Sequence, residues 1–126
     1  MSLVGSPANF KKILSNKKLA LLGDAIVNFI ASAALSLQKG ATGIKVSGKI
    51  LQSVYSLSIL ATLDIEGIDK GEAVEAFLAY AWLNNMFTCE DGVKVVYGSL
   101  KKGKNLDEAL AGLIDKVFKE HLTEYD

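Results

Sequence analysis

The chain has 126 residues with no net formal charge at neutral pH, and half of its residues are apolar. This length and composition exclude a disordered chain and predict that residues 1–126 form a single globular domain. Cys89 and His121 are the only residues of their types, which excludes intrachain disulfides and a zinc site of the usual Cys and His ligands. The lone cysteine also indicates a reducing compartment, so we expect the protein to be cytoplasmic.

The balanced total conceals an uneven distribution of charge along the chain. Residues 1–63 hold seven lysines and a single acid, Asp24, for a net charge of +6. Residues 64–126 hold seven lysines and thirteen acids, for a net charge of −6. The first half therefore suits contact with a polyanion, while the second half concentrates carboxylates.

A short first helix is predicted to begin at Ser6, an N-cap residue followed by Pro7. A long second helix is predicted over residues 16–38, with Gly40 as its C-cap. Residues 19–37 of this helix are almost long and apolar enough to span a membrane, but Asp24 within them disfavours insertion. We therefore expect a helix buried inside the fold and no membrane partner.

Polar residues recur at every fourth position of this second helix. Asp24, Asn28, Ser32 and Ser36 fall on one stripe of an otherwise apolar cylinder. The stripe must face something polar, and Asn28 lies one turn from Asp24 as a possible supporting partner.

The rest of the chain also follows helical patterns. A helix is predicted over residues 46–63, with a strand as the alternative for its beginning. Three further helices are predicted over residues 69–84, 88–103 and 105–122, because Asp69, Thr88 and Asn105 are each followed three residues later by an acid. Residues 93–97 have strand-like composition but lack a partner strand. The predicted fold class is all-α, with five or six helices.

Three carboxylates stand out because they lie on apolar helices. Asp24 is the only acid in the first half, and Glu75 is the only charge between residues 73 and 83. Glu72 lies three residues earlier, on the same helix face as Glu75. Carboxylates buried together need a cation, and an all-oxygen site suits Mg²⁺, with Mn²⁺ as a second possibility.

Structural roles for the same residues remain open at this point. Glu72 also suits the capping of a helix start. Asp24 also suits a pair with a lysine or with Asn28, and Glu75 a buried ion pair with a lysine.

The two carboxylate-bearing segments resemble the motifs of the ribonuclease III family. Residues 22–25, Leu-Gly-Asp-Ala, are similar to the core of the family's signature helix, whose Asp is a catalytic metal ligand. Residues 72–78, which begin with Glu72 and include Glu75, resemble the second family motif, although its first acid is usually Asp. The resemblance implies an endonuclease-domain helical bundle in which Asp24 and Glu75 are catalytic and Asp24, Glu72 and Glu75 bind the metal.

The resemblance also implies an activity and partners. Family members hydrolyse phosphodiester bonds in double-stranded RNA with Mg²⁺, and they act as symmetric homodimers with the signature helix near the interface. Asn28 would then position Asp24 without itself binding the metal. The lysines expected to contact RNA phosphates, if they are more than solvated surface charges, are Lys17, Lys18, Lys45 and Lys49.

One departure from the family pattern affects the expected activity. The family normally has a Glu four residues before the signature Asp, whereas this chain has Ala20. The compact Mini-III branch, which lacks a double-stranded-RNA-binding domain, also has Ala there, and we expect this chain to resemble it in both respects. The alternative is a catalytically impaired RNA-binding or scaffold dimer of the same fold. An unrelated helical interaction module, with a purely structural acidic stripe, is the third hypothesis.

Overall fold

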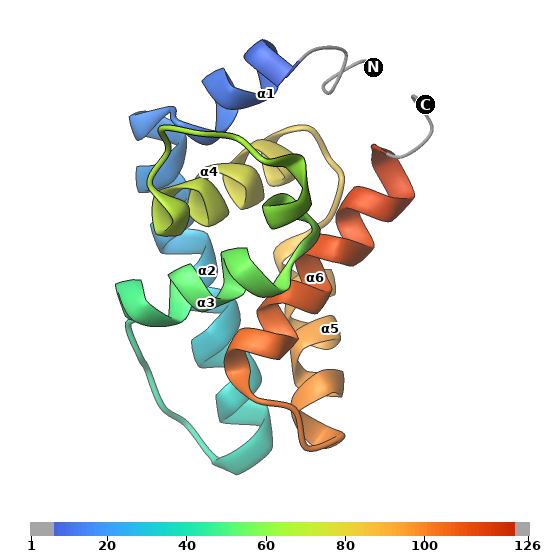
Figure 1. Cartoon of the computed structure of the whole chain (residues 1–126). Coiled ribbons are helices and arrows are strands. Elements are labelled where there is room, and N and C mark those ends of the chain that lie inside the picture. The colour runs from blue at the N-terminus through green and yellow to red at the C-terminus, as the bar shows by residue number, and fades with distance from the viewer. Residues whose placement is uncertain (1–6, 123–126) are drawn as a thin grey trace.

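The computed structural model describes residues 7–122, which form six α-helices and one 3₁₀-helix joined by loops (Figure 1). The described residues contain no strand, so the predicted all-α class is confirmed. The helices are α1 (Pro7–Leu14), α2 (Lys17–Lys39), α3 (Gly48–Leu57), η1 (Ile59–Leu63), α4 (Lys70–Leu83), α5 (Cys89–Lys101) and α6 (Leu106–His121).

The predicted signals bound the first two helices correctly. Pro7 is the first residue of α1, while its predicted cap Ser6 lies outside the described residues. The side chain of Asn16 accepts a hydrogen bond from the backbone N–H of Leu19 and so caps α2. Gly40 ends α2 with a φ of 102°, a backbone conformation that favours glycine.

The single helix predicted over residues 46–63 is wrong, because the helix is interrupted at Ser58. Ser58 has an extended backbone, and its hydroxyl donates to the carbonyl of Tyr55 and accepts from the N–H of Leu60. A serine hydroxyl can satisfy backbone groups locally in this way, which competes with helix continuation. The segment therefore forms α3 and then η1, and the strand alternative for its beginning is also wrong.

The predicted starts of the last three helices are confirmed. Asp69 Oδ1 accepts from the N–H of Glu72 at 2.9 Å at the start of α4. Thr88 and Asp91 form a capping box that begins α5, and Glu108 Oε1 accepts from the N–H of Asn105 at 2.9 Å before α6. Residues 93–97 lie within α5, so they are helical and not a strand.

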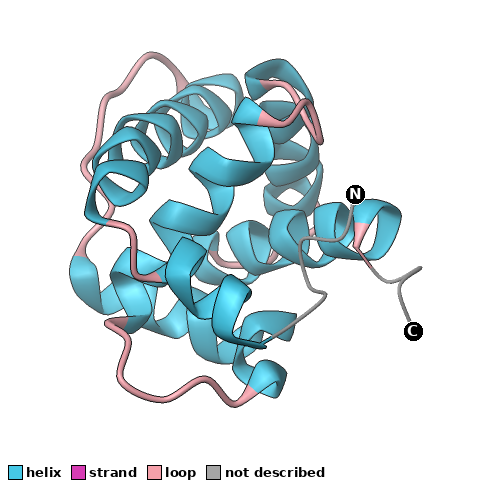
Figure 2. Ribbon diagram, turned by 90° about the horizontal axis from the view of Figure 1, so that it is seen from above, coloured by secondary structure: helices cyan, strands magenta, loops and turns pink. Residues whose placement is uncertain are grey.

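Helix α2 is packed against α4 and α5, and α3 lies against α4 and α6 (Figures 1 and 2). Figure 1 shows α4 crossing the half of α2 that is nearer its N-terminus. Phe10, Phe77 and Phe118 meet with ring centroids 6.3–6.4 Å apart and join α1, α4 and α6. This core fixes the face of α4 that is turned toward α2.

One side of α2 is left uncovered. By length and composition alone α2 would be able to cross a membrane, as core helices of many bundles would. Here it packs against α4 and α5, yet only 39% of its most apolar 18-residue stretch is buried. Leu21, Phe29 and Leu37 remain exposed on its outer side.

Candidate functional site

The site is built where α2 and α4 touch backbone to backbone. Gly23 is buried at this crossing, and a Cβ atom added to it would lie 1.8 Å from the carbonyl oxygen of Glu75. Only glycine permits so close an approach. The contact therefore places Asp24, the next residue of α2, against Glu75 of α4, as the sequence predicted for two facing helices.

The two carboxylates are hydrogen-bonded to each other, and they differ in protonation. Glu75 is only 8% exposed, and burial, the hydrogen bond with Asp24 and the negative charge of Asp24 raise its pKa to about 7. Lys45 hydrogen-bonds to Asp24 and keeps the pKa of that carboxyl below its usual value, against the opposing effect of burial. At neutral pH Asp24 is therefore ionised, while Glu75 holds or releases its proton within the physiological range.

Asp24 has two further polar neighbours. The Nζ atom of Lys45 lies 3.0 Å from Asp24 Oδ1. Asn28 Nδ2 donates to the same oxygen at 3.2 Å, while Asn28 Oδ1 accepts from the N–H of Val46 at 2.7 Å. Asn28 thus supports Asp24 and at the same time fixes the loop that carries Lys45.

The polar stripe of α2 faces this same loop, residues 40–47. Ser32 Oγ donates to the carbonyl of Ile44 and accepts from its N–H, at 3.2 and 2.9 Å. Ser36 Oγ makes the equivalent pair of bonds with Thr42, at 3.0 and 2.9 Å. The sequence predicted a polar neighbour for the stripe but did not identify it, because a loop with no regular hydrogen bonding leaves no periodic signal.

Glu72, the third predicted carboxylate, forms an ion pair with a lysine of α2. Its Oε1 atom lies 2.6 Å from the Nζ atom of Lys17 on α2. Among the described residues no group of three or more His, Cys, Asp or Glu side chains is placed to hold a metal ion. The structure thus joins Asp24 and Glu75 and pairs Glu72 with a lysine.

A cavity of about 300 Å³ lies beside this arrangement. Its lining residues are Lys17, Ala20, Leu21, Glu72 and Glu75. The small side chain of Ala20, which stands where the family motif has a carboxylate, is itself buried and borders this space. The cavity gives an ion or a substrate group a route to the Glu72 and Glu75 side of the site.

The donor set is compatible with a loosely held magnesium ion. Mg²⁺ prefers oxygen ligands, keeps several of its waters, and is commonly held by one or two carboxylates together with substrate phosphates. Asp24 and Glu75 supply two carboxylates from two rigid helices. They are therefore the residues that would hold a divalent ion, with solvent and phosphate oxygens completing its shell.

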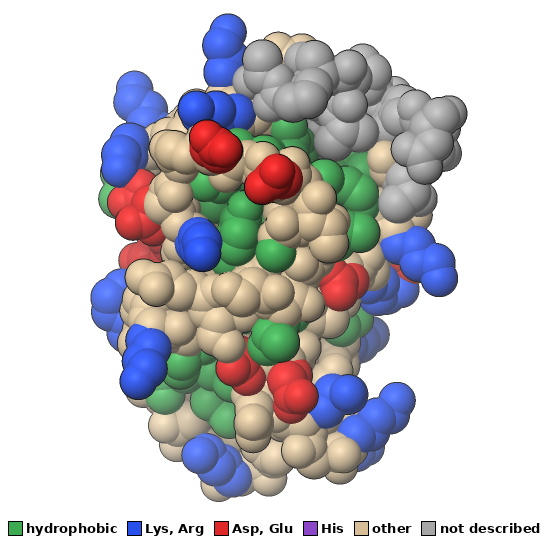
Figure 3. All heavy atoms as spheres, viewed as in Figure 1, with side chains coloured by type: hydrophobic (Ala, Val, Ile, Leu, Met, Phe, Trp, Pro, Cys, Tyr) green, Lys and Arg blue, Asp and Glu red, His purple; other side chains and the backbone are tan. Residues whose placement is uncertain are grey.

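The four lysines predicted to contact phosphate fall into two groups. Lys17 and Lys45 are paired with Glu72 and Asp24, whereas Lys18 and Lys49 are exposed on α2 and α3. The face shown in Figure 3 carries both lysines and acids, and neither gathers into one patch.

Known families provide an independent comparison. A family model described as "Ribonuclease III" matches residues 17–123, which include α2 to α6 with Asp24 and Glu75. No curated protein matches the chain. The family match points to an RNA endonuclease, and it does not distinguish the compact branch, which stays a prediction.

Proposed function

The chain belongs to the ribonuclease III family, and on that premise we propose that it is a metal-dependent endoribonuclease acting on double-stranded or structured RNA. The observation that carries the proposal is the contact of Gly23 with the Glu75 backbone, which fixes two carboxylates against each other on rigid helices. Rigid placement of charged groups is what catalysis of phosphodiester hydrolysis requires. Mg²⁺, with Mn²⁺ as a substitute, is the proposed cofactor.

A bound divalent ion would supply a water of lowered pKa and neutralise charge that develops on the phosphate. Asp24 is ionised at neutral pH and offers a carboxylate oxygen directly, with Asn28 holding its orientation. Glu75 has a pKa of about 7, so it can release its proton and become a second ligand at little cost. Glu72 borders the same cavity and is the third proposed ligand once it leaves Lys17.

Lysines around the carboxylates would hold the RNA. Duplex RNA is recognised chiefly by its shape and by contacts to phosphate and 2′-hydroxyl groups. Lys18 and Lys49 are exposed and already available for such contacts. Lys17 and Lys45 would join them by exchanging a carboxylate partner for a phosphate.

We propose a homodimer that covers the outer side of α2. Leu21, Phe29 and Leu37 are 74%, 55% and 59% exposed, and they follow a path that winds around the uncovered side of the helix, because each step of eight residues turns an α-helix by about 80°. A second copy of α2, related by a two-fold axis and packed at Phe29, would cover part of this exposed apolar surface. Leu21 also lines the cavity beside Glu75, so the partner subunit would border the proposed active site.

One observation favours a second candidate, a catalytically impaired RNA-binding dimer of the same fold. Only two carboxylates meet, because Ala20 has no carboxylate and Glu72 is paired with Lys17. Under this alternative the protein binds duplex RNA through its lysines and does not cut it.

Cleavage of a labelled RNA duplex in Mg²⁺, in Mn²⁺ and in EDTA tests the proposal. We expect cutting that depends on the divalent ion and that Asp24→Asn or Glu75→Gln reduces by about 100-fold or more, since each removes a ligand. Glu120→Gln is the matched control, because Glu120 is an exposed carboxylate paired with Lys116 on α6. If the protein binds the duplex without cutting it, and neither site variant changes the binding, the result would favour the catalytically impaired RNA-binding dimer.

A further inference from the structure

We propose that Lys45 is a tethered counter-cation, which occupies the cation position at Asp24 and competes with a divalent ion for it. The inference rests on the proposed function, because it takes Asp24 and Glu75 as the metal-binding carboxylates. The inference adds Lys45, a residue outside both carboxylate motifs, as one that sets how readily the site takes up metal.

The loop that carries Lys45 is held along α2 by side chains at regular spacing. Thr42, Ile44 and Val46 alternate along the loop, and their backbone groups bond in turn to Ser36, Ser32 and Asn28. These hydrogen bonds replace the backbone partners that a loop would otherwise find in water. The loop is thereby led back along α2 toward Asp24.

Lys45 lies at the end of this series of hydrogen bonds between the loop and α2. The next residue, Val46, is bound to Asn28, and Asn28 is itself bound to Asp24. The ammonium group of Lys45 completes the arrangement at 3.0 Å from Asp24 Oδ1. Asp24 Oδ1 thus accepts hydrogen bonds from two groups. The loop positions the Lys45 ammonium, and α2 positions the Asn28 amide.

The pairing is exchangeable, because the lysine side chain is 73% exposed. An exposed ion pair is weak, and its ammonium can leave for water or for a phosphate without a large desolvation cost. A cation bound at Asp24 Oδ1 must displace or repel this ammonium. Lys45 therefore lowers the affinity of Asp24 for metal while no phosphate is present to draw the ammonium away.

A phosphate near the loop would change this balance. When the Lys45 ammonium moves to a phosphate oxygen, Asp24 loses its counter-cation and its affinity for a divalent ion rises. Because coupling between two ligands is reciprocal, metal binding then strengthens the contact of Lys45 with phosphate. The arrangement favours metal uptake together with substrate.

Mn²⁺ binding to the protein without RNA, followed by electron paramagnetic resonance of the free ion, tests the inference. We expect Lys45→Gln to bind Mn²⁺ about three- to tenfold more tightly than the wild type, as the loss of one nearby positive charge requires. Lys39→Gln removes an exposed lysine at the C-terminal end of α2, immediately before the loop, and should leave the affinity unchanged. Lys45→Arg keeps the charge and should not tighten binding, which separates the charge from any effect on folding.

Two results would overturn the inference in distinguishable ways. If Asp24→Asn abolishes Mn²⁺ binding while Lys45→Gln leaves it equal or weaker, Lys45 is not a competitor and the proposed function still stands. If Asp24→Asn leaves Mn²⁺ binding intact, the carboxylate pair is not the metal site, and both proposals fail together.

Discussion

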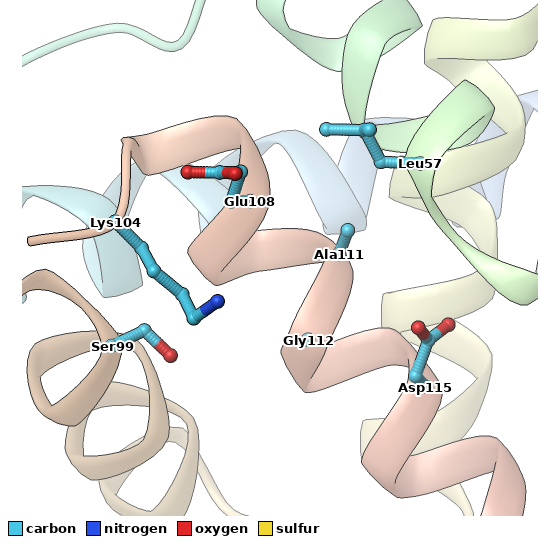
Figure 4. A pocket seen from close by; sticks show the side chains of 7 residues that line it. All are labelled: Leu57, Ser99, Lys104, Glu108, Ala111, Gly112 and Asp115. Atoms are coloured by element: carbon cyan, nitrogen blue, oxygen red, sulfur yellow. The ribbon is translucent and has the colours of Figure 1, made fainter. Parts of the chain in front are cut away.

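The α2–α4 crossing and the groove beside α6 contain the same kinds of residue and use them differently. Each has acids, a lysine and a helix glycine. At the crossing, Gly23 lets two backbones touch and brings two carboxylates from different helices together. In the groove, a cavity of about 230 Å³, Gly112 has open space where a Cβ would lie. Figure 4 shows Lys104 and Ser99 converging at one end of the groove.

The partners of the carboxylates distinguish the two regions. In the groove, Asp115 accepts from the backbone N–H of Ile59 and Glu108 from that of Asn105. Both acids therefore satisfy backbone N–H groups. Asp24 instead accepts from the side chains of Lys45 and Asn28, and Glu75 is hydrogen-bonded to Asp24. Carboxylates that take no part in capping are the ones left available for a metal ion or a substrate.

Alanine at the two helix glycines should have opposite effects on stability. Gly23→Ala forces a methyl group into the Glu75 carbonyl, so we expect the free energy of unfolding to fall by about 3 kcal/mol or more. Gly112→Ala meets open space and should raise it by about 0.5–1 kcal/mol, because alanine favours helix. Urea denaturation measures both. Equal effects at the two positions would remove the proposed difference between the crossing and the groove.

A charge on the outer side of α2 should prevent self-association. Phe29 is 55% exposed at the centre of the proposed interface, so Phe29→Lys should raise the dimer dissociation constant by about 100-fold. Leu57, which is 51% exposed beside the α6 groove, provides the control Leu57→Lys, for which no change is expected. Sedimentation equilibrium distinguishes the outcomes. A wild-type protein that stays monomeric at high concentration would contradict the proposed homodimer.

The free energy of unfolding should fall as the pH rises from the ordinary pKa of Glu75 to its raised pKa in the folded protein. The pKa of Glu75 is about 7 in the folded protein and 4.5 ordinarily, so between these values the unfolded chain loses a proton that the folded chain keeps. Without divalent ions, we expect the free energy of unfolding to decrease by about 3 kcal/mol across this window. The lowered pKa of Asp24 affects stability in a different pH range. The stability that it contributes is lost only as the pH falls below the ordinary pKa of 3.8.

Urea denaturation at several pH values checks this prediction. Glu75→Gln should remove most of the decrease, whereas Glu108→Gln, a cap in the α6 groove, should retain it. A pH profile that Glu75→Gln leaves unchanged would show that Glu75 does not carry the raised pKa.

Local signals made most of the fold predictable from the sequence. Asn16, Asp69 and Thr88 each cap the helix that follows them, and a cap depends only on residues within one turn. The break between α3 and η1 was not predictable to the same degree. Besides the local bonds of Ser58, the N–H of Ile59 is held by Asp115, a residue 56 positions away on α6.

The site was predictable in its members and only partly in its geometry. Asp24 was identifiable as the only acid in the first half of the chain, and Glu75 as the only charge between residues 73 and 83. Their contact depends on the space left by Gly23, and the separation of Glu72 depends on Lys17, 55 residues away. Pairings between distant residues follow from packing, which no spacing within one helix encodes. The role of the polar stripe in holding the loop was missed for the same reason.

The central claim is that the Asp24–Glu75 pair is a metal-dependent site for cutting RNA. Its most direct test is the initial rate of duplex RNA cleavage in saturating Mg²⁺ by Asp24→Asn relative to the wild type. The account predicts a rate lower by about 100-fold or more for the variant, with Glu120→Gln close to the wild type. Cleavage by Asp24→Asn at the wild-type rate, or by the wild type at the same rate in EDTA, would contradict it.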